Sequence, residues 1–188
     1  DRVRYDRSGY DWVDVNLAAG TATVSWDGTV YSQELSNIEW VRGSDGDDTI
    51  TGDAGANRID GRDGDDQMNG GGGSDTFQGS AGDDTINGGA GVDHVWYDVA
   101  YADATITATG SGWEITIDGE TDTLTNIEWL GFSDQTVNIG GLDTIYGTPG
   151  FDILEGTEES DIIDGLAAND FIDGLGGDDT IYGGQGND

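Results

Sequence analysis

Acidic side chains recur at nine-residue spacing along much of the chain, and carboxylates arrayed in this way could hold a divalent cation. From Gly43 to Trp96 the chain reads as six consecutive nonapeptides, with glycine at the first and fourth positions and a large apolar residue at the eighth. The sixth-position residues are Asp48, Asn57, Asp66, Asp75, Asp84 and Asp93. A period sustained over so many repeats indicates a stacked repeat architecture.

The positions of glycine and of the apolar residues predict how each repeat folds. Glycine permits positive φ, so the first six residues are expected to form a tight turn. The last three, such as Thr49 to Thr51, alternate like a short strand whose middle side chain points inward. Two repeats would then make one coil of a right-handed parallel β-roll, with a sheet on each side. The inward residues are Ile50, Ile59, Met68, Phe77, Ile86 and Val95.

Stacking of the coils would bring each sixth-position residue over the same residue two repeats later. The pairs are Asp48 with Asp66, Asn57 with Asp75, Asp66 with Asp84, and Asp75 with Asp93. Neighbouring strands lie about 4.8 Å apart, where two carboxylates repel by roughly 3–4 kcal/mol at an effective dielectric constant near 20. A cation between them reverses the sign. Calcium fits better than magnesium, because it accepts about six to eight oxygens, including carbonyls, in a tolerant geometry.

Composition narrows the classes of function. The formal charge is −33, with 39 acidic and 6 basic side chains, so a nucleic-acid partner is not expected. The chain has no cysteine, no apolar run near the ~20 residues of a transmembrane segment, and no signal peptide at its start. A disordered acidic tail is the alternative. The aromatic residues and the strict repeat argue against it when calcium is bound, whereas calcium-free repeats are expected to be disordered.

The rest of the chain predicts an all-β protein in which two roll blocks alternate with antiparallel hairpin units. Asp27-Gly28 and Asp118-Gly119 are strong hairpin signals, and each hairpin segment ends on Asn-Ile-Glu-Trp. The expected boundaries are 1–42 for a hairpin capping unit, 43–96 for the first roll block, 97–137 for a second capping unit and 138–188 for the second roll block.

The second block is less regular. Its sixth-position residues are all aspartate: Asp143, Asp152, Asp161, Asp170, Asp179 and Asp188. Glu159 and Ala168 replace the fourth-position glycine, at a cost of roughly 1–2 kcal/mol each if the backbone there is left-handed. Because the chain begins and ends on the sixth residue of a repeat, we expect it to be part of a larger polypeptide.

The nonapeptide blocks resemble the RTX (repeats-in-toxin) family of hemolysin-type calcium-binding repeats. The stretches Leu124 to Glu128 and Phe132 to Val137 also resemble segments found between RTX blocks. The resemblance implies a secreted, extracellular protein of a Gram-negative bacterium. Such a protein would pass unfolded through the type I secretion machinery and fold in the calcium outside.

The resemblance also implies the ligand set, in which two stacked turns share each ion. The second block then adds the pairs Asp143 with Asp161, Asp152 with Asp170, Asp161 with Asp179, and Asp170 with Asp188, for up to about eight ions in all. The site with the neutral Asn57 is expected to bind more weakly. Main-chain carbonyls would complete the sites: those of Asp45, Ala54, Asp63, Gly64, Gly73, Gly82 and Gly91.

No enzymatic activity is expected of this chain, although RTX modules are attached to enzymes, toxins and adhesins. His94 is the only histidine, and neither a His-Glu-x-x-His motif nor a nucleophile elbow is present. A glycosidase carboxylate pair stays open by residue type alone. The outward residues are too varied for an ice-binding face. The alternative function is attachment to a polysaccharide or cell surface through tryptophans that otherwise cap the roll: Trp12, Trp26, Trp40, Trp96, Trp113 and Trp129.

Overall fold

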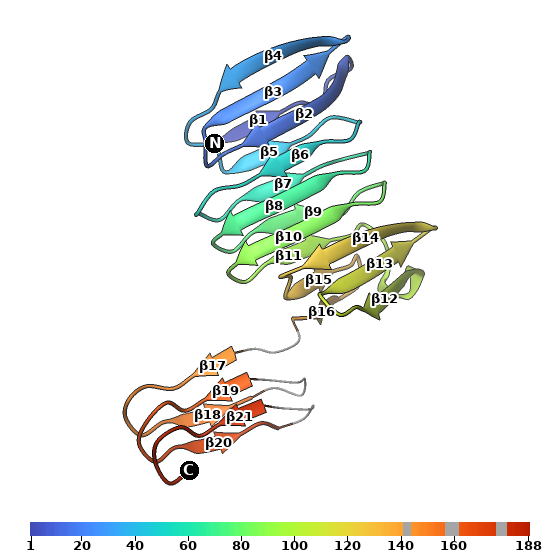
Figure 1. Ribbon diagram of the computed structural model, residues 1–188. Helices are drawn as coiled ribbons and strands as arrows, with labels where there is room; N and C mark the ends of the chain where they lie inside the picture. Colours follow the sequence, from blue (N-terminus) through green and yellow to red (C-terminus); the bar gives the residue numbers. More distant parts are fainter. Residues whose placement is uncertain (141–143, 157–161, 176–179) are drawn as a thin grey trace. The chain divides into compact units, whose positions relative to one another are not determined.

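Short strands joined by glycine-rich turns make up nearly all of the computed structural model of the chain (Figure 1). It describes residues 1–140, 144–156, 162–175 and 180–188. Apart from the 3₁₀ turn η1 (Tyr101–Asp103), these residues form strands, turns and loops, which confirms the all-β class and the parallel roll. The chain divides into two compact units, Asp1–Ile139 and Gly140–Asp188, and each is described by itself.

One sheet of the first unit has seven strands in the order β1-β5-β7-β9-β11-β15-β16. Successive strands are parallel up to β15, and β16 is antiparallel to it. The register places Ile59 beside Phe77, one predicted coil further on. The strands are β1 (Arg2–Arg4), β5 (Trp40–Arg42), β7 (Arg58–Asp60), β9 (Thr76–Gln78), β11 (His94–Trp96), β15 (Trp129–Gly131) and β16 (Thr136–Asn138).

The opposite sheet has nine strands in the order β12-β13-β14-β10-β8-β6-β2-β3-β4. Its middle, from β14 to β2, is parallel, and an antiparallel hairpin extends it at each end. The strands are β2 (Tyr10–Asn16), β3 (Thr21–Trp26), β4 (Thr29–Glu34), β6 (Thr49–Thr51), β8 (Gln67–Gly72), β10 (Thr85–Ala90), β12 (Ala104–Ala108), β13 (Trp113–Ile117) and β14 (Glu120–Thr125).

The core of the first unit lies between these two sheets. All six predicted inward residues, from Ile50 to Val95, are buried. Each fully buried side chain of this size contributes roughly 1.5–3 kcal/mol relative to an exposed one. The hairpin segments add Val41 beside Ile59 and Leu130 beside Val95, both fully buried. The ends of these segments therefore run as further coils of the same roll.

The hairpins form where the Asp-Gly pairs predict them. Asp27 and Gly28 have φ of 46° and 73°, and Asp118 and Gly119 have φ of 53° and 99°, as a two-residue hairpin loop requires. None of the six tryptophans is fully buried, and Trp12 and Trp96 are the most exposed.

The second unit is a smaller roll. β17 (Thr144–Tyr146), β19 (Ile162–Asp164) and β21 (Thr180–Tyr182) form one parallel sheet, and β18 (Ile153–Glu155) and β20 (Phe171–Asp173) form the other. Ile163 is fully buried between its neighbours, whereas Ile181 on the edge strand β21 is 48% exposed. Ala168 has a φ of 98°, so the cost predicted for its replacement of glycine applies. Glu159 lies outside the described residues.

Candidate metal centre

Two ladders of carboxylates run along the turns of the first unit. Along one edge the Asp48 N–H donates to Asp66 Oδ1 at 2.8 Å, and the Asp66 N–H to Asp84 Oδ1 at 3.0 Å. Along the other edge the Asn57 N–H donates to Asp75 Oδ1, and the Asp75 N–H to Asp93 Oδ1, both at 2.7 Å. All of these side chains are buried. The structure thus brings together the four pairs expected from the repeat.

The second oxygen of most ladder carboxylates has no hydrogen-bond donor. These oxygens are buried and have no partner among the described residues: Oδ2 of Asp66, Asp75, Asp84 and Asp93, and Oδ2 of Asp170 in the second unit. A buried, unpaired carboxylate oxygen is costly, because it has lost its water and gained nothing in return. Such an oxygen is suited to a cation.

The side-chain oxygen of the residue that begins each ladder is not open, because it accepts a hydrogen bond from a backbone N–H of its own turn. Ser44 donates to Asp48 Oδ2 at 2.7 Å, and Asp53 donates to Asn57 Oδ1 at 2.8 Å. In the second unit, Thr148 donates to Asp152 Oδ2 at 2.6 Å. The open carboxylate oxygens therefore belong to the later members of each ladder.

First-position glycines show what surrounds the open oxygens. A methyl group at Gly70 would collide with the Asp75 carboxylate and would lie 2.6 Å from the Gly88 carbonyl oxygen of the next coil. A methyl group at Gly61 would collide with the Asp66 carboxylate. The turns at Gly61 and Gly70 therefore enclose oxygens that lie too close for a side chain. Within the described residues, no group of three or more His, Cys, Asp or Glu could hold a metal alone. A hard cation that accepts carbonyl oxygens, as calcium does, fits this donor set.

Fourth-position glycines shape the same turns through their backbone conformation. Gly64, Gly73, Gly82 and Gly91 all have positive φ, between 95° and 139°. The carbonyls of Gly64 and Gly73 lie against Gly82 and Gly91 of the next coil. The other carbonyls predicted as donors lie in these turns or in the turns of the preceding coil: those of Asp45, Ala54, Asp63, Gly82 and Gly91.

The sequence profile of the RTX calcium-binding nonapeptide repeat matches the chain in four copies, over residues 42–77, 69–99, 139–167 and 155–188. Together the matches cover more than half of the chain. The chain belongs to the RTX calcium-binding repeat family.

The other comparisons add little to this RTX assignment. No curated protein sequence matches the chain. Among solved structures, the extracellular lipase LipA from Serratia marcescens is similar at 20% identity with a TM-score of 0.29. The match covers 81% of this chain and 28% of the lipase chain, so the chain spans less than a third of that protein. Among the described residues, no helix is long and apolar enough to cross a membrane.

Burial gives the carboxylates of the first RTX roll unusual acidities. It raises the pKa of Asp66 to about 8, with a further contribution from the charges of Asp48 and Asp84. Burial likewise raises the pKa of Asp84 to about 7 and that of Asp75 to about 6, and it raises the pKa values of Asp48 and Asp93. At a pH below these pKa values, and with no cation bound, a proton takes the place of the cation on Asp66, Asp84 and Asp75.

The second RTX roll repeats the ladder at one edge. The Asp152 N–H donates to Asp170 Oδ1 and the Asp170 N–H donates to Asp188 Oδ1, both at 2.9 Å. A methyl group at Gly165 would lie 2.7 Å from Asp170 Oδ2 and 2.9 Å from the Gly183 carbonyl oxygen. The predicted ligands of the other edge, Asp143, Asp161 and Asp179, lie outside the described residues.

The structure also places two carboxylates in the ladders that sequence reasoning missed. Asp122 Oδ1 accepts the Asp84 N–H at 3.0 Å, and Glu128 Oε2 accepts the Asp93 N–H at 2.7 Å. A sequence signal existed for Glu128. It stands two residues before the buried Leu130, as each sixth-position residue stands two before the inward eighth.

His94 stands at the seventh position of its repeat, where the strand pattern predicts an outward side chain. It is half-buried, and its ring stacks on Trp129 with the ring centres 6.1 Å apart. This contact gives His94 a packing role beside the last turn of the first roll.

Proposed function

We propose that this RTX module couples its folding to calcium binding outside the cell. The supporting observation is the set of buried carboxylate oxygens that have no donor among the described residues. Those of Asp75 and Asp170 lie in cradles that a carbonyl oxygen of the next coil also approaches. Such sites exist only in the folded chain, so the free energy of calcium binding contributes directly to folding. Without calcium, the same oxygens oppose the stacking of the coils.

This coupling suits a protein exported unfolded by a type I secretion system and folded on arrival. Extracellular calcium modules bind with dissociation constants of roughly 10⁻⁴–10⁻³ M, so they stay empty at the low calcium concentration of the cytosol. The module would then stabilise and present an attached enzyme, toxin or adhesin domain of the same polypeptide. Its two rolls would hold up to about eight calcium ions in the predicted pairs.

A calcium titration tests this function. Starting from excess chelator, far-ultraviolet circular dichroism should gain β signal cooperatively between roughly 0.1 and 1 mM calcium, and magnesium should not replace it. Asp75→Asn should shift the midpoint to higher calcium. Asp118→Asn, which removes one charge from an exposed hairpin turn, should not. A spectrum that is fully folded in chelator at neutral pH would refute the coupling.

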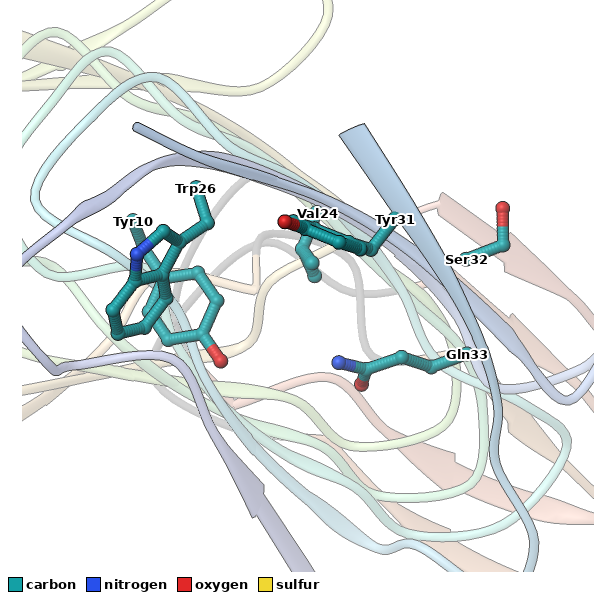
Figure 2. A pocket seen from close by; sticks show the side chains of 6 residues that line it. All are labelled: Tyr10, Val24, Trp26, Tyr31, Ser32 and Gln33. Atoms are coloured by element: carbon teal, nitrogen blue, oxygen red, sulfur yellow. The ribbon is translucent and has the colours of Figure 1, made fainter. Parts of the chain in front are cut away.

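A second candidate function is attachment to a polysaccharide through the first hairpin unit. An open pocket of about 460 Å³ there is lined by Tyr10, Val24, Trp26, Tyr31, Ser32 and Gln33 (Figure 2). The rings of Tyr10 and Trp26 pack edge to face, with centres 4.6 Å apart. Aromatic faces next to hydroxyl and amide groups are suited to a sugar ring, which has apolar faces and polar edges.

Affinity electrophoresis in gels that contain a soluble polysaccharide tests this candidate, at saturating calcium. Tyr31→Ala should abolish retardation of the protein, because this half-exposed ring lines the pocket. Val30→Ala is the matched control, since Val30 is similarly exposed on the same strand but does not line the pocket. Equal migration with and without each of a panel of acidic and neutral polysaccharides would exclude attachment by this pocket.

A further inference from the structure

Asp93, the last aspartate of one ladder, is not exposed to solvent. Its side chain is completely buried, Oδ1 accepts the Asp75 N–H at 2.7 Å, and Oδ2 has no hydrogen-bond partner among the described residues. Inside the ladder, an oxygen of this kind lies beside a carbonyl from the next nonapeptide. No nonapeptide follows Asp93 in the stack. The next coil belongs to the second hairpin unit. There the short turn from Asn126 to Glu128 takes the position of a repeat turn.

This short turn supplies the same kinds of oxygen as a repeat turn. A methyl group at Gly88 would collide with both the Asn126 carbonyl and the Asp93 carboxylate, just as one at Gly70 would meet the Gly88 carbonyl and Asp75. Asn126 has a φ of 52°, a left-handed conformation that asparagine tolerates better than most residues.

Glu128 occupies the ladder position of a sixth-position aspartate. Its Oε2 accepts the Asp93 N–H at 2.7 Å, and Asp93 Oδ1 accepts the Asp75 N–H at the same distance. Thr125 pairs with Asn87 and Trp129 pairs with His94, so three residues span the gap that six span in a repeat. The side chain of glutamate, one methylene longer than that of aspartate, suits the shorter path of the main chain.

At the other edge of the roll, the closing carboxylate already has a hydroxyl donor. Asp122 Oδ1 accepts the Asp84 N–H, but Tyr97 donates its hydroxyl proton to Asp122 Oδ2 at 2.7 Å. A methyl group at Gly79 would collide with the Tyr97 ring, whose carbons are the three atoms nearest to it. The ring thus takes the space that the oxygen cradle occupies in the other turns, and a hydroxyl donor meets the carboxylate.

We propose that the first roll holds one calcium ion beyond the predicted pairs, between the turn Gly88 to Asp93 and the turn Asn126 to Glu128. Asp93 and Glu128 supply the carboxylates and Asn126 a carbonyl, so the hairpin unit closes this edge as a ligand donor. The inference rests on the proposed function, because it needs calcium in the regular turns as well. The residues of this added site come partly from outside the nonapeptide repeats.

Native mass spectrometry of the 188-residue chain at saturating calcium provides the test. Glu128→Gln should bind one ion fewer than the wild type, since it keeps an oxygen for the Asp93 N–H but loses the charge. Glu128→Asp should lose the same ion because its side chain is too short. A control variant should keep the wild-type number: Glu120→Gln, which changes an exposed acid of the same hairpin.

The outcomes separate this inference from the proposed function. If the wild type binds no calcium, the proposed function fails and the added site fails with it. If the wild type binds several ions and Glu128→Gln binds the same number, only the added site is refuted. If the variants do not fold, ¹³C-labelled glutamate in the wild type decides instead. Calcium should shift the Glu128 carboxylate resonance strongly and the Glu120 resonance little, and equal small shifts would refute the site.

Discussion

The two rolls of this RTX module share one turn design but differ in what encloses it. In the first roll, strands from both hairpin units continue the two sheets, and every inward side chain from Ile50 to Val95 is buried. In the second roll, Ile163 is fully buried, but the inward Ile181 is about half exposed, and Phe151, Ile153 and Phe171 are largely exposed. The first roll therefore has the more fully buried apolar core, and the second relies more on its turns.

Those turns are also less favourable in the second roll. Leu166, Ala168 and Leu175 all have positive φ there. Among the described residues of the first roll's nonapeptides, Arg62 is the only non-glycine residue with positive φ. Each costs roughly 1–2 kcal/mol in this conformation. With a smaller core and more strain, the second roll needs more of its folding free energy from bound calcium.

The largest expected effect is a difference in calcium requirement between the rolls. In a calcium titration followed by hydrogen exchange and mass spectrometry, strands β18 to β20 should become protected at a calcium concentration several-fold higher than strands β6 to β10. The reason is that less burial supports the second roll, so more binding free energy is needed. Exchange of the hairpin β3–β4, at the end of the nine-stranded sheet, serves as the internal reference. Identical midpoints for both rolls would show that core burial does not set the requirement.

The next largest effect concerns pH in the calcium-free state of the first roll. The pKa values of Asp66, Asp84 and Asp75 are raised to about 8, 7 and 6, above an unfolded value near 4. Groups with raised values bind more protons in the folded state. The stability they provide is complete below about pH 4 and is lost as the pH rises through 6 to 8.

We therefore expect the calcium-free first roll to lose more than about 3 kcal/mol between pH 4 and 8, since one pKa unit corresponds to about 1.4 kcal/mol. The protonated, calcium-free roll is expected to fold at acid pH, so urea unfolding of the calcium-free protein at pH values rising from 4, followed by tryptophan fluorescence, measures this change until the roll no longer folds near neutral pH. Calcium should remove most of the dependence, because it replaces the protons. Stability that rises with pH in chelator would contradict the burial of these carboxylates.

A smaller effect is expected from filling one cradle. Gly70→Ala should destabilise the calcium-loaded first roll by about 1–3 kcal/mol, the usual cost of overpacking, because the added methyl collides with Asp75. Gly110→Ala is the control, since nothing lies near Gly110 and its φ is not positive. Gly165→Ala in the second roll should cost less, because its nearest oxygens are 2.7 and 2.9 Å away. Calorimetry of the calcium-loaded proteins would rank the three, and an equal cost for Gly70→Ala and Gly110→Ala would argue against the cradle.

The repeat itself made much of this architecture predictable. A strict nine-residue period determines which side chains point inward and which carboxylates stack, so the pairs from Asp48 to Asp93 could be listed from the sequence. The contribution of the hairpin units could not. Their strands join the roll through long-range pairing, and the turn from Asn126 to Glu128 is three residues shorter than the period requires. A search for a constant spacing passes over Glu128 for that reason, and the position of the Tyr97 ring leaves no signal in the spacing at all.

The smallest effect would relieve strain in the second roll. Ala168 lies at the fourth position of its repeat with a φ of 98°, where the corresponding residues of the first roll, such as Gly73 and Gly82, are glycine. Ala168→Gly should stabilise the second roll by about 1 kcal/mol, because the relief of a left-handed alanine exceeds the entropy cost of glycine.

Arg62→Gly is the counterpart in the first roll, with a φ of 84°. Its gain should be smaller, since the substitution also removes the ion pair between Arg62 and Asp45. Thermal unfolding in calcium, monitored separately for each roll by hydrogen exchange, measures both variants. If Ala168→Gly leaves the second roll unchanged, then strain in the turns does not explain the difference between the two rolls, and the smaller core must account for it alone.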